Sequence, residues 1–293
     1  MKKIGICGTG LMGASMAQIF AEQGYETWIY GRTDASLSRA EKIIHLGDEH
    51  SVNYTTDLED LKDCEIIIES IVENLDTKQD FFERISKIVM PETILATNTS
   101  GLSINKICER VQGKERFLGM HWFNPSNLIP LIEIIRNDET SDGYVQQVYT
   151  LAEAIGKKPV ICQNDVAGFI ANRIQFAVLR ECMDIVEKGT ATPEDVDKVM
   201  KYGLGFRYAA YGPFEVADFG GLDTFYHISE YLNKDLCDEK EPQKLIKDLY
   251  EQECYGVKSG RGFYDYSDGR DKEAVSLRDK KFEDMKKLQD SWE

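Results

Sequence analysis

The chain has 293 residues, of which 42% are hydrophobic, and a formal net charge of −16 at pH 7. This length and composition suit two domains with an ample core, and the acidic balance excludes nucleic-acid binding that depends on a basic surface. No apolar stretch is longer than a strand, so we expect no membrane span. The first predicted strand begins at Lys3, which leaves no room for a signal peptide and predicts a cytoplasmic protein. Seven cysteines without C-x-x-C spacing and only four histidines predict reduced thiols and no metal site.

The first predicted strand ends in a glycine-rich turn. Residues 3–7 are mostly apolar and lead into Gly8-Thr9-Gly10-Leu11-Met12-Gly13, which has the spacing G-x-G-x-x-G, and a helical pattern follows at once. Gly8 permits the tight turn, Gly10 lets the backbone approach a pyrophosphate, and Gly13 lets helix and strand pack closely. The start of the helix, at Leu11 and Met12, then offers free N–H groups to the phosphates. Because the motif lies between a strand and a helix, we predict dinucleotide binding rather than a purely structural turn.

The second predicted strand, 26–30, ends without the acidic residue that takes the adenosine ribose hydroxyls of NAD. Gly31, Arg32 and Thr33 follow it instead. A guanidinium binds a 2′-phosphate through two hydrogen bonds and a hydroxyl can donate to it, whereas a carboxylate would repel it. These residues favour NADP(H) over NAD(H). The alternative is an Arg32 side chain that stacks on adenine and binds no phosphate.

Strand and helix patterns alternate through the first half of the chain. Further strands are expected at 64–70, 93–97, 117–121, 131–135 and 159–162, and helices near 35–46, 78–88 and 142–155. This alternation predicts an α/β fold with a doubly wound, Rossmann-like and mostly parallel sheet.

Strand patterns stop near Asp165, and only helical patterns follow, over 168–187, 193–201, 222–232 and 243–250. We therefore expect residues 1–166 to form an NAD(P)-binding domain and residues 167–293 an all-α domain for substrate binding and dimerisation. The charge-dense tail from Ser267 onward keeps an apolar stripe at helical spacing. That stripe predicts a tail helix packed on the body or on a partner subunit.

A histidine and a glutamate occur in two neighbouring strand patterns. His121 stands where a strand becomes a loop, at the edge where open α/β sheets bind ligands. Glu133 lies inside the apolar run 131–135, where a carboxylate is costly to bury without a partner. Together they would form a general base, because the glutamate fixes the imidazole tautomer and stabilises the imidazolium. Spacing alone equally permits a core histidine and an edge-exposed glutamate.

Longer motifs run along the chain as far as Tyr266, at 97–104, 119–125, 131–135, 167–173, 212–214, 218–223 and 258–266. In sequence, order and spacing they resemble the motifs of the L-3-hydroxyacyl-CoA dehydrogenase family, and the resemblance covers nearly the whole chain. It implies a Rossmann-like domain followed by a helical domain, and a dehydrogenase that uses a nicotinamide cofactor.

The resemblance also implies roles for particular residues. By similarity His121 is the catalytic base and Glu133 its partner, while Ser100 and Asn172 hydrogen-bond the substrate's reacting oxygen and neighbouring carbonyl. The positions that line the nicotinamide half of the cofactor site correspond to Glu73, Lys78, Asn98, Asn124 and Lys258. Oxidation of a secondary alcohol needs a base for the hydroxyl proton as hydride leaves carbon, which agrees with these roles. The structural alternatives are a turn at Ser100 and a helix cap at Asn172.

The chain departs from the family pattern at several positions. The arm between 31 and 65, which in the family contributes contacts to the CoA adenosine portion, is short; Pro130 replaces a lysine, and Gly101 replaces a serine. Pro130 and Arg207 resemble the carnitine, gulonate and lambda-crystallin relatives, so Arg207 is predicted to bind a substrate carboxylate. A salt bridge that positions a loop is the alternative for Arg207.

These features predict a dehydrogenase of short, 3-hydroxybutyryl-CoA-like substrates, in fatty-acid or butyrate metabolism, acting as a homodimer. The alternative substrate class is a free 3-hydroxy acid similar to carnitine or gulonate. A crystallin-like protein that binds NADPH without turnover is the remoter alternative. The joint presence of the four predicted catalytic residues argues against it, because binding alone needs none of them.

Overall fold

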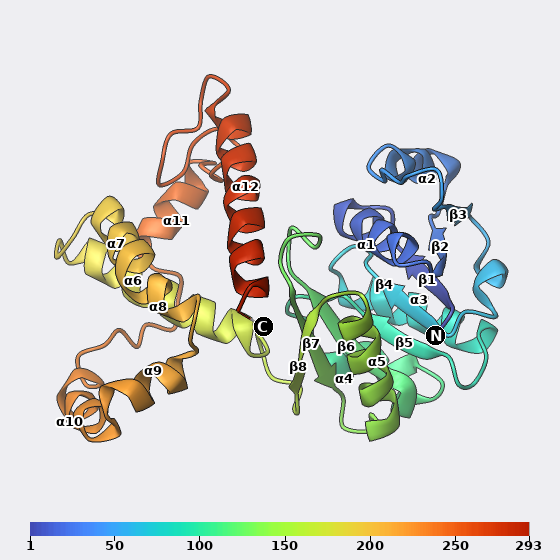
Figure 1. Ribbon diagram of the computed structural model, residues 1–293, viewed down its shortest axis with the longest axis horizontal. Helices are drawn as coiled ribbons and strands as arrows, with labels where there is room; N and C mark the ends of the chain where they lie inside the picture. The colour runs from blue at the N-terminus through green and yellow to red at the C-terminus, as the bar shows by residue number, and fades with distance from the viewer. Residues whose placement is uncertain (293) are drawn as a thin grey trace. The chain divides into compact units, whose positions relative to one another are not determined.

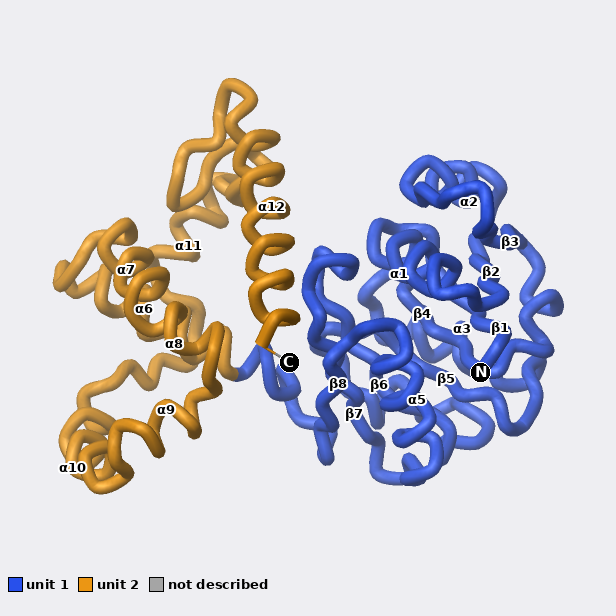
Figure 2. Tube along the Cα trace, in the orientation of Figure 1, with its two compact units in different colours: residues 1–173 blue, residues 174–293 orange. Residues whose placement is uncertain are grey.

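The computed structural model describes residues 1–292, and the chain divides into two compact units, residues 1–173 and the residues from Ile174 onward (Figures 1 and 2). The first unit is an eight-stranded, mostly parallel sheet with helices packed on both faces, and the second is helical. The predicted α/β class, with a Rossmann-like sheet followed by a helical domain, is therefore confirmed.

The sheet of the first unit has the strand order β3-β2-β1-β4-β5-β6-β7-β8. The strands are β1 (Lys3–Cys7), β2 (Glu26–Tyr30), β3 (Val52–Thr55), β4 (Ile66–Glu69), β5 (Ile94–Thr97), β6 (Phe117–Trp122), β7 (Leu131–Arg136) and β8 (Lys158–Cys162). All neighbouring pairs are parallel except β6 and β7. The antiparallel register of that pair places His121 directly opposite Glu133.

The helices of the first unit cover two separate apolar layers. They are α1 (Leu11–Glu22), α2 (Asp34–Glu41), α3 (Leu75–Ile88), the short α4 (Ile104–Ile107) and α5 (Asp142–Ala154). Side chains of α1 and α5 pack in one layer, and those of α3 and α4 pack in the other. Strand β4 contributes to both, because Ile66 and Ile68 face the first layer and Ile67 faces the second. Burial on both faces explains why these strands read as continuous apolar runs.

The largest differences from the sequence prediction lie between β2 and β4; in addition, α3 begins at Leu75 rather than at residue 78, and the short α4 was not expected. Helix α2 ends at Glu41, before the expected Leu46, and β3 adds an edge strand that no pattern indicated. Strand β3 has only four residues, and most of them are partly or fully accessible to solvent. Its hydrophobic pattern is therefore weak, and pairing with β2 is what defines it as a strand.

The second unit is built from helices. Helix α6 (Ala171–Glu187) begins in the last residues of the first unit and continues into the second. The others are α7 (Pro193–Val199) with a π-helical turn at Met200–Leu204, α8 (Gly205–Tyr208), α9 (Pro213–Gly220), α10 (Leu222–Leu232), α11 (Lys244–Glu251) and α12 (Arg270–Asp290). The charged tail forms α12, and the side-chain amide of Gln289 donates to the carbonyl oxygen of Ala209 (2.9 Å). Among residues 1–292, no helix combines the length and apolar character that a bilayer crossing requires.

The second unit leaves much apolar surface uncovered in a single chain. Met183 is the one large apolar side chain after Arg173 that is buried, within the part of the chain that the structure describes. The most exposed aromatic side chains of the unit are Tyr202, Phe206, Phe214 and Phe219. Exposed apolar area on this scale is typical of a protein–protein interface.

Candidate active site

The glycine-rich turn after β1 has the geometry that a dinucleotide requires. Gly8 has φ +131°, and a Cβ atom there would lie 2.2 Å from the carbonyl oxygen of Ser70. A Cβ atom on Gly13 would lie 2.0 Å from the carbonyl oxygen of Gly8, so only glycine allows this close approach. At Gly10 an added Cβ would meet no atom within 4 Å. This open space lies at the N-terminus of α1, where no side chain caps the helix, so the first N–H groups are available to a pyrophosphate.

Leu11 and Met12 lie between the last two glycines of the turn. Leu11 is exposed and Met12 is partly buried, and both belong to the first turn of α1. The close approaches at Gly8 and Gly13 and the uncapped start of α1 fit a dinucleotide, whose pyrophosphate would contact the backbone of residues 8–13.

The first residue after β2, Gly31, has little space for a side chain. A Cβ atom on Gly31 would lie 2.6 Å from Oγ of Ser36 and 2.7 Å from Cγ2 of Thr9. Arg32 is exposed, and its side chain makes no hydrogen bond or ion pair within residues 1–292. Thr33 caps α2, where its Oγ1 accepts from the backbone N–H of Ser36 (3.2 Å). Its hydroxyl proton can still be donated to a ligand.

His121 and Glu133 form a buried pair. The imidazole is 5% exposed and the carboxylate 0% exposed, and Nδ1 of His121 lies 2.8 Å from Oε2 of Glu133. The second oxygen, Oε1, accepts from the backbone N–H groups of Ile170 (2.9 Å) and Ala171 (2.8 Å). The β6–β7 pairing thus brings His121 to the Glu133 carboxylate, and the start of α6 brings two N–H donors to the same group.

The ionisation of Glu133 determines which ring nitrogen of His121 carries the proton. Burial raises its pKa, but the hydrogen bonds from His121, Ala171 and Ile170 outweigh burial, and the pKa of Glu133 is lowered. An ionised Glu133 can only accept, so Nδ1 of His121 carries the proton and donates it. The other ring nitrogen, Nε2, then presents a lone pair, which is what a general base needs.

Two phenylalanines flank the imidazole. The ring centroid of Phe123 lies 4.4 Å from that of His121, and the centroid of Phe169 lies 5.8 Å away. Phe169 is buried and has φ +48°, a left-handed conformation that is costly for a side chain of this size. Reasoning from single residues missed Phe169, although it lies inside the 167–173 motif.

Ser100 is held by its backbone from two sides. Its N–H donates to Oε1 of Glu73 (3.0 Å), and its carbonyl oxygen accepts from Nδ2 of Asn172 (2.9 Å). Glu73 Oε1 also accepts from the Thr99 hydroxyl (2.5 Å). Burial raises the pKa of Glu73, but Thr99, Lys78 and Ser100 together lower it, so the carboxylate is ionised. The hydroxyl of Ser100 is exposed and remains available to a substrate oxygen.

The remaining predicted cofactor residues of the first unit differ in exposure. Lys78 is completely buried between Oε1 of Glu69 (2.6 Å) and Oε2 of Glu73 (3.3 Å). Asn98 accepts from the backbone N–H of Trp122 (2.9 Å), which joins the ends of β5 and β6. Asn124 is exposed and precedes a cis peptide bond to Pro125.

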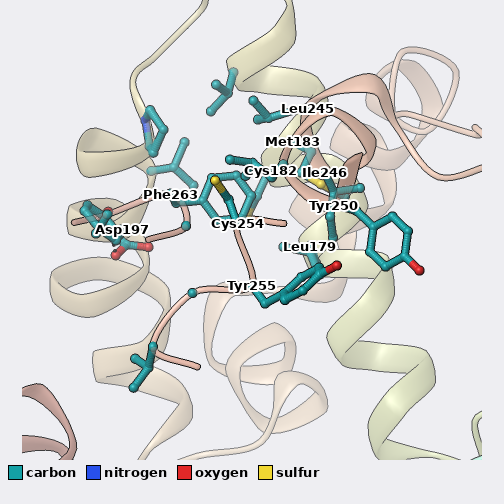
Figure 3. A pocket seen from close by; sticks show the side chains of 18 of the residues that line it. Leu179, Cys182, Met183, Asp197, Leu245, Ile246, Tyr250, Cys254, Tyr255 and Phe263 are labelled. Atoms are coloured by element: carbon teal, nitrogen blue, oxygen red, sulfur yellow. Dashed lines mark hydrogen bonds between the residues drawn. The ribbon is translucent and has the colours of Figure 1, made fainter. Parts of the chain in front are cut away.

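Lys258 and Arg207 belong to the second unit, and both are exposed. Neither side chain makes a hydrogen bond or ion pair within residues 1–292. The same unit contains an apolar cavity of about 630 Å³, formed by side chains of α6, α7, α11 and the segment after α11 (Figure 3). Figure 3 shows Cys182, Cys254 and Tyr255 at this cavity, which includes none of the predicted site residues. In the described part of the chain, no three His, Cys, Asp or Glu side chains cluster as metal ligands would.

The fold and this site define the class of protein: it is an oxidoreductase with a dinucleotide-binding domain, acting on CH–OH groups. Residues 3–52 and 48–166 match the family model of the 3-hydroxyacyl-CoA dehydrogenase NAD-binding domain, and residues 168–266 match that of its C-terminal domain. The chain belongs to the 3-hydroxyacyl-CoA dehydrogenase family. The matched segments meet near residue 167, whereas the first compact unit extends to Arg173 and includes Ile170 and Ala171, whose N–H groups donate to Glu133.

Three known proteins illustrate the similarity. A probable 3-hydroxybutyryl-CoA dehydrogenase of Deinococcus radiodurans is 38% identical over 90% of this chain and 100% of its own length. The crystal structure of (S)-3-hydroxybutyryl-CoA dehydrogenase from Ralstonia eutropha has a TM-score of 0.75 at 32% identity, over 91% of this chain and 99% of that one. The crystal structure of a 5-formyl-3-hydroxy-2-methylpyridine 4-carboxylic acid 5-dehydrogenase, described as an NAD⁺-dependent dismutase, has a TM-score of 0.93 at 31% identity and covers 99% of both chains.

Proposed function

We propose that the protein interconverts an L-3-hydroxyacyl group and the corresponding ketone, with His121 as the general base. The buried 2.8 Å hydrogen bond between His121 and Glu133 carries this proposal, because it leaves Nε2 free to take the hydroxyl proton. A bound nicotinamide would accept the hydride that leaves C3. The alcohol oxygen becomes a carbonyl, its proton moves to His121, and Glu133 stabilises the resulting imidazolium.

The other predicted residues have roles consistent with this reaction. In the ketone-reducing direction, the Ser100 hydroxyl and the Asn172 amide would stabilise negative charge that develops on the substrate oxygen. Glu73, Asn98 and Asn124 would line the nicotinamide half of the cofactor site. Lys78 is wholly buried, so it would serve the site through Glu73 rather than by direct contact.

For the substrate we propose a short 3-hydroxyacyl-CoA, supported by the relatives named 3-hydroxybutyryl-CoA dehydrogenase. A second candidate is a small substrate with its own carboxylate, bound by Arg207. The 5-formyl-3-hydroxy-2-methylpyridine 4-carboxylic acid 5-dehydrogenase, whose named substrate carries a carboxylate, supports this candidate. Its similarity covers 99% of the chain and so includes helix α12. The family models stop at residue 266, and the two CoA-dependent relatives cover 90% and 91% of the chain.

Steady-state assays separate the two substrate classes. Acetoacetyl-CoA, acetoacetate and 5-formyl-3-hydroxy-2-methylpyridine 4-carboxylate are offered with each cofactor in the appropriate redox state. We expect the highest kcat/KM with acetoacetyl-CoA. A higher value with either free acid would overturn the acyl-CoA assignment, and a drop in that value for Arg207→Met would then identify the carboxylate-binding residue.

We propose that the cofactor is NADP(H), because Arg32 and Thr33 offer donors to a 2′-phosphate and position 31 carries a glycine instead of an acid. Asp34 follows at the start of α2, and one relative is NAD⁺-dependent, so a direct test is needed. Arg32→Asp is expected to shift the ratio of kcat/KM for NADPH over NADH toward NADH by about 10-fold or more, equivalent to the loss of one charge-assisted interaction. An unchanged ratio would contradict the assignment.

We propose that the protein is a homodimer formed through the second unit, supported by the exposed aromatic side chains of that unit. Light scattering is expected to give twice the mass of one chain, and a monomer at micromolar concentration would refute the proposal. The cytoplasmic location and the place in fatty-acid or butyrate metabolism stay predictions.

A further inference from the structure

Glu69 is a buried carboxylate that the proposed reaction does not use. It ends β4, next to β1 in the centre of the sheet, and its side chain is 0% exposed. Its Oε1 accepts from Nζ of Lys78 (2.6 Å) and from the backbone N–H of Ile71 (2.7 Å), and its Oε2 accepts from the Thr97 hydroxyl (2.6 Å). These three donors offset the cost of burying the carboxylate, which would be very high for an unpaired charge.

The partner of Glu69 is equally enclosed. The Lys78 side chain is 0% exposed, so its ammonium has no access to solvent or to a bound ligand. It lies between two carboxylates, 2.6 Å from Glu69 and 3.3 Å from Glu73. The Glu73 side chain is 42% exposed. One buried cation therefore links a fully buried carboxylate to a carboxylate at the surface of the site.

The link continues to the predicted substrate-binding residues. Glu73 binds the N–H of Ser100 and the hydroxyl of Thr99, and the carbonyl of Ser100 binds Asn172. The polar contacts thus run without a break from Thr97 in the sheet, through Glu69, Lys78 and Glu73, to Ser100. We propose that Glu69 is a positioning residue that fixes Lys78 and, through Glu73, the turn that carries the Ser100 hydroxyl. This proposal rests on the proposed function for the role of Ser100.

The division of the Lys78 ammonium between two carboxylates explains how Glu69 performs this task. The ammonium lies closer to Glu69 than to Oε2 of Glu73, and Oε1 of Glu73 accepts from Thr99 and Ser100. If position 69 is neutral, the ammonium is attracted to Glu73 alone, and Glu73 is drawn away from the backbone N–H of Ser100. A displacement of about 1 Å in a positioning group can lower the rate by about 100-fold.

The variant Glu69→Gln tests this role, because it keeps the shape of the side chain and one acceptor oxygen and removes its charge. We expect kcat to fall about 10- to 100-fold, with the substrate KM changed less than about threefold, because the turn shifts while binding surfaces remain. The matched control is Arg116→Gln in the same unit. The guanidinium of Arg116 is also buried and donates to the carbonyl oxygens of Ser86, Met90, Thr93 and Gln112, so its loss should lower Tm and leave kcat unchanged.

A double-mutant cycle shows whether Glu69 acts through Lys78. Lys78→Met and the double variant Glu69→Gln/Lys78→Met should have the same kcat, because the charge at position 69 has no further effect once the ammonium is absent. Multiplicative losses, or a Glu69→Gln variant with wild-type kcat, would overturn the proposal. If Glu69→Gln does not fold, Thr97→Val removes one donor to Oε2 and should lower kcat about two- to fivefold without changing KM; no change refutes the proposal.

Comparison of His121→Ala with Glu69→Gln distinguishes a wrong positioning role from a wrong proposed function. If His121→Ala is inactive and Glu69→Gln matches the wild type, only the positioning role is wrong. If His121→Ala is fully active, the proposed reaction itself is wrong, whatever the behaviour of position 69.

Discussion

Replacement of His121 by alanine is expected to lower kcat by about 10²- to 10⁴-fold, the usual contribution of a general base. The affinity for the reduced cofactor should stay within about twofold, because the glycine turn that binds the pyrophosphate uses backbone atoms of residues 8–13. Stopped-flow or steady-state reduction of acetoacetyl-CoA measures kcat. Quenching of protein fluorescence measures the cofactor affinity separately.

His227 supplies the matched control for this experiment. It is exposed on α10 and pairs with Glu230 of the same helix (3.0 Å), so His227→Ala removes a histidine outside the predicted site. We expect its kcat to equal that of the wild type. Full turnover by His121→Ala would eliminate this residue as the base, and a loss of activity in both variants would show that the effect is not specific.

The second large effect is expected for Glu133→Gln. Glutamine can donate from its amide to Nδ1 of His121, which places the imidazole proton on Nε2 and removes the lone pair that the base needs. We expect kcat to fall by about 10²- to 10⁴-fold, within the range for loss of a general base. Glu133→Ala should be worse for folding, because it also leaves the N–H groups of Ile170 and Ala171 without their acceptor, at a cost of about 1–3 kcal/mol each.

The same carboxylate makes stability depend on pH. The pKa of Glu133 is lowered from 4.5 in the folded protein, so the folded state binds this proton less readily than the unfolded state. The stabilising contribution of Glu133 is therefore fully present above pH 4.5. It decreases as the pH falls below 4.5 and is lost below the folded pKa. Urea unfolding from pH 7 to pH 3.5 should show this decrease, and Glu133→Gln should show a smaller one; identical slopes for both proteins would contradict the assignment.

Local patterns in the sequence were sufficient to predict much of the secondary structure of this protein. The glycine turn at 8–13 and the boundaries of β2 and α10 depend on residues that are neighbours in the chain, and so they could be predicted closely. The motifs between residues 97 and 266, taken together in their order and spacing, identified the family. Strand β3 was not predictable, because its four residues become a strand only by pairing with β2.

The sequence by itself determined the class of fold, the family and the residue types available for chemistry. Only the tertiary structure decided which of them meet, because strand register and helix packing join residues that are far apart in the chain. The antiparallel β6–β7 pair brings His121 to Glu133, and the start of α6 adds two N–H donors to the same carboxylate. Glu69 shows the difference most clearly: in the sequence it is one acid at the end of an apolar strand, and in the fold it binds Thr97 and the buried Lys78.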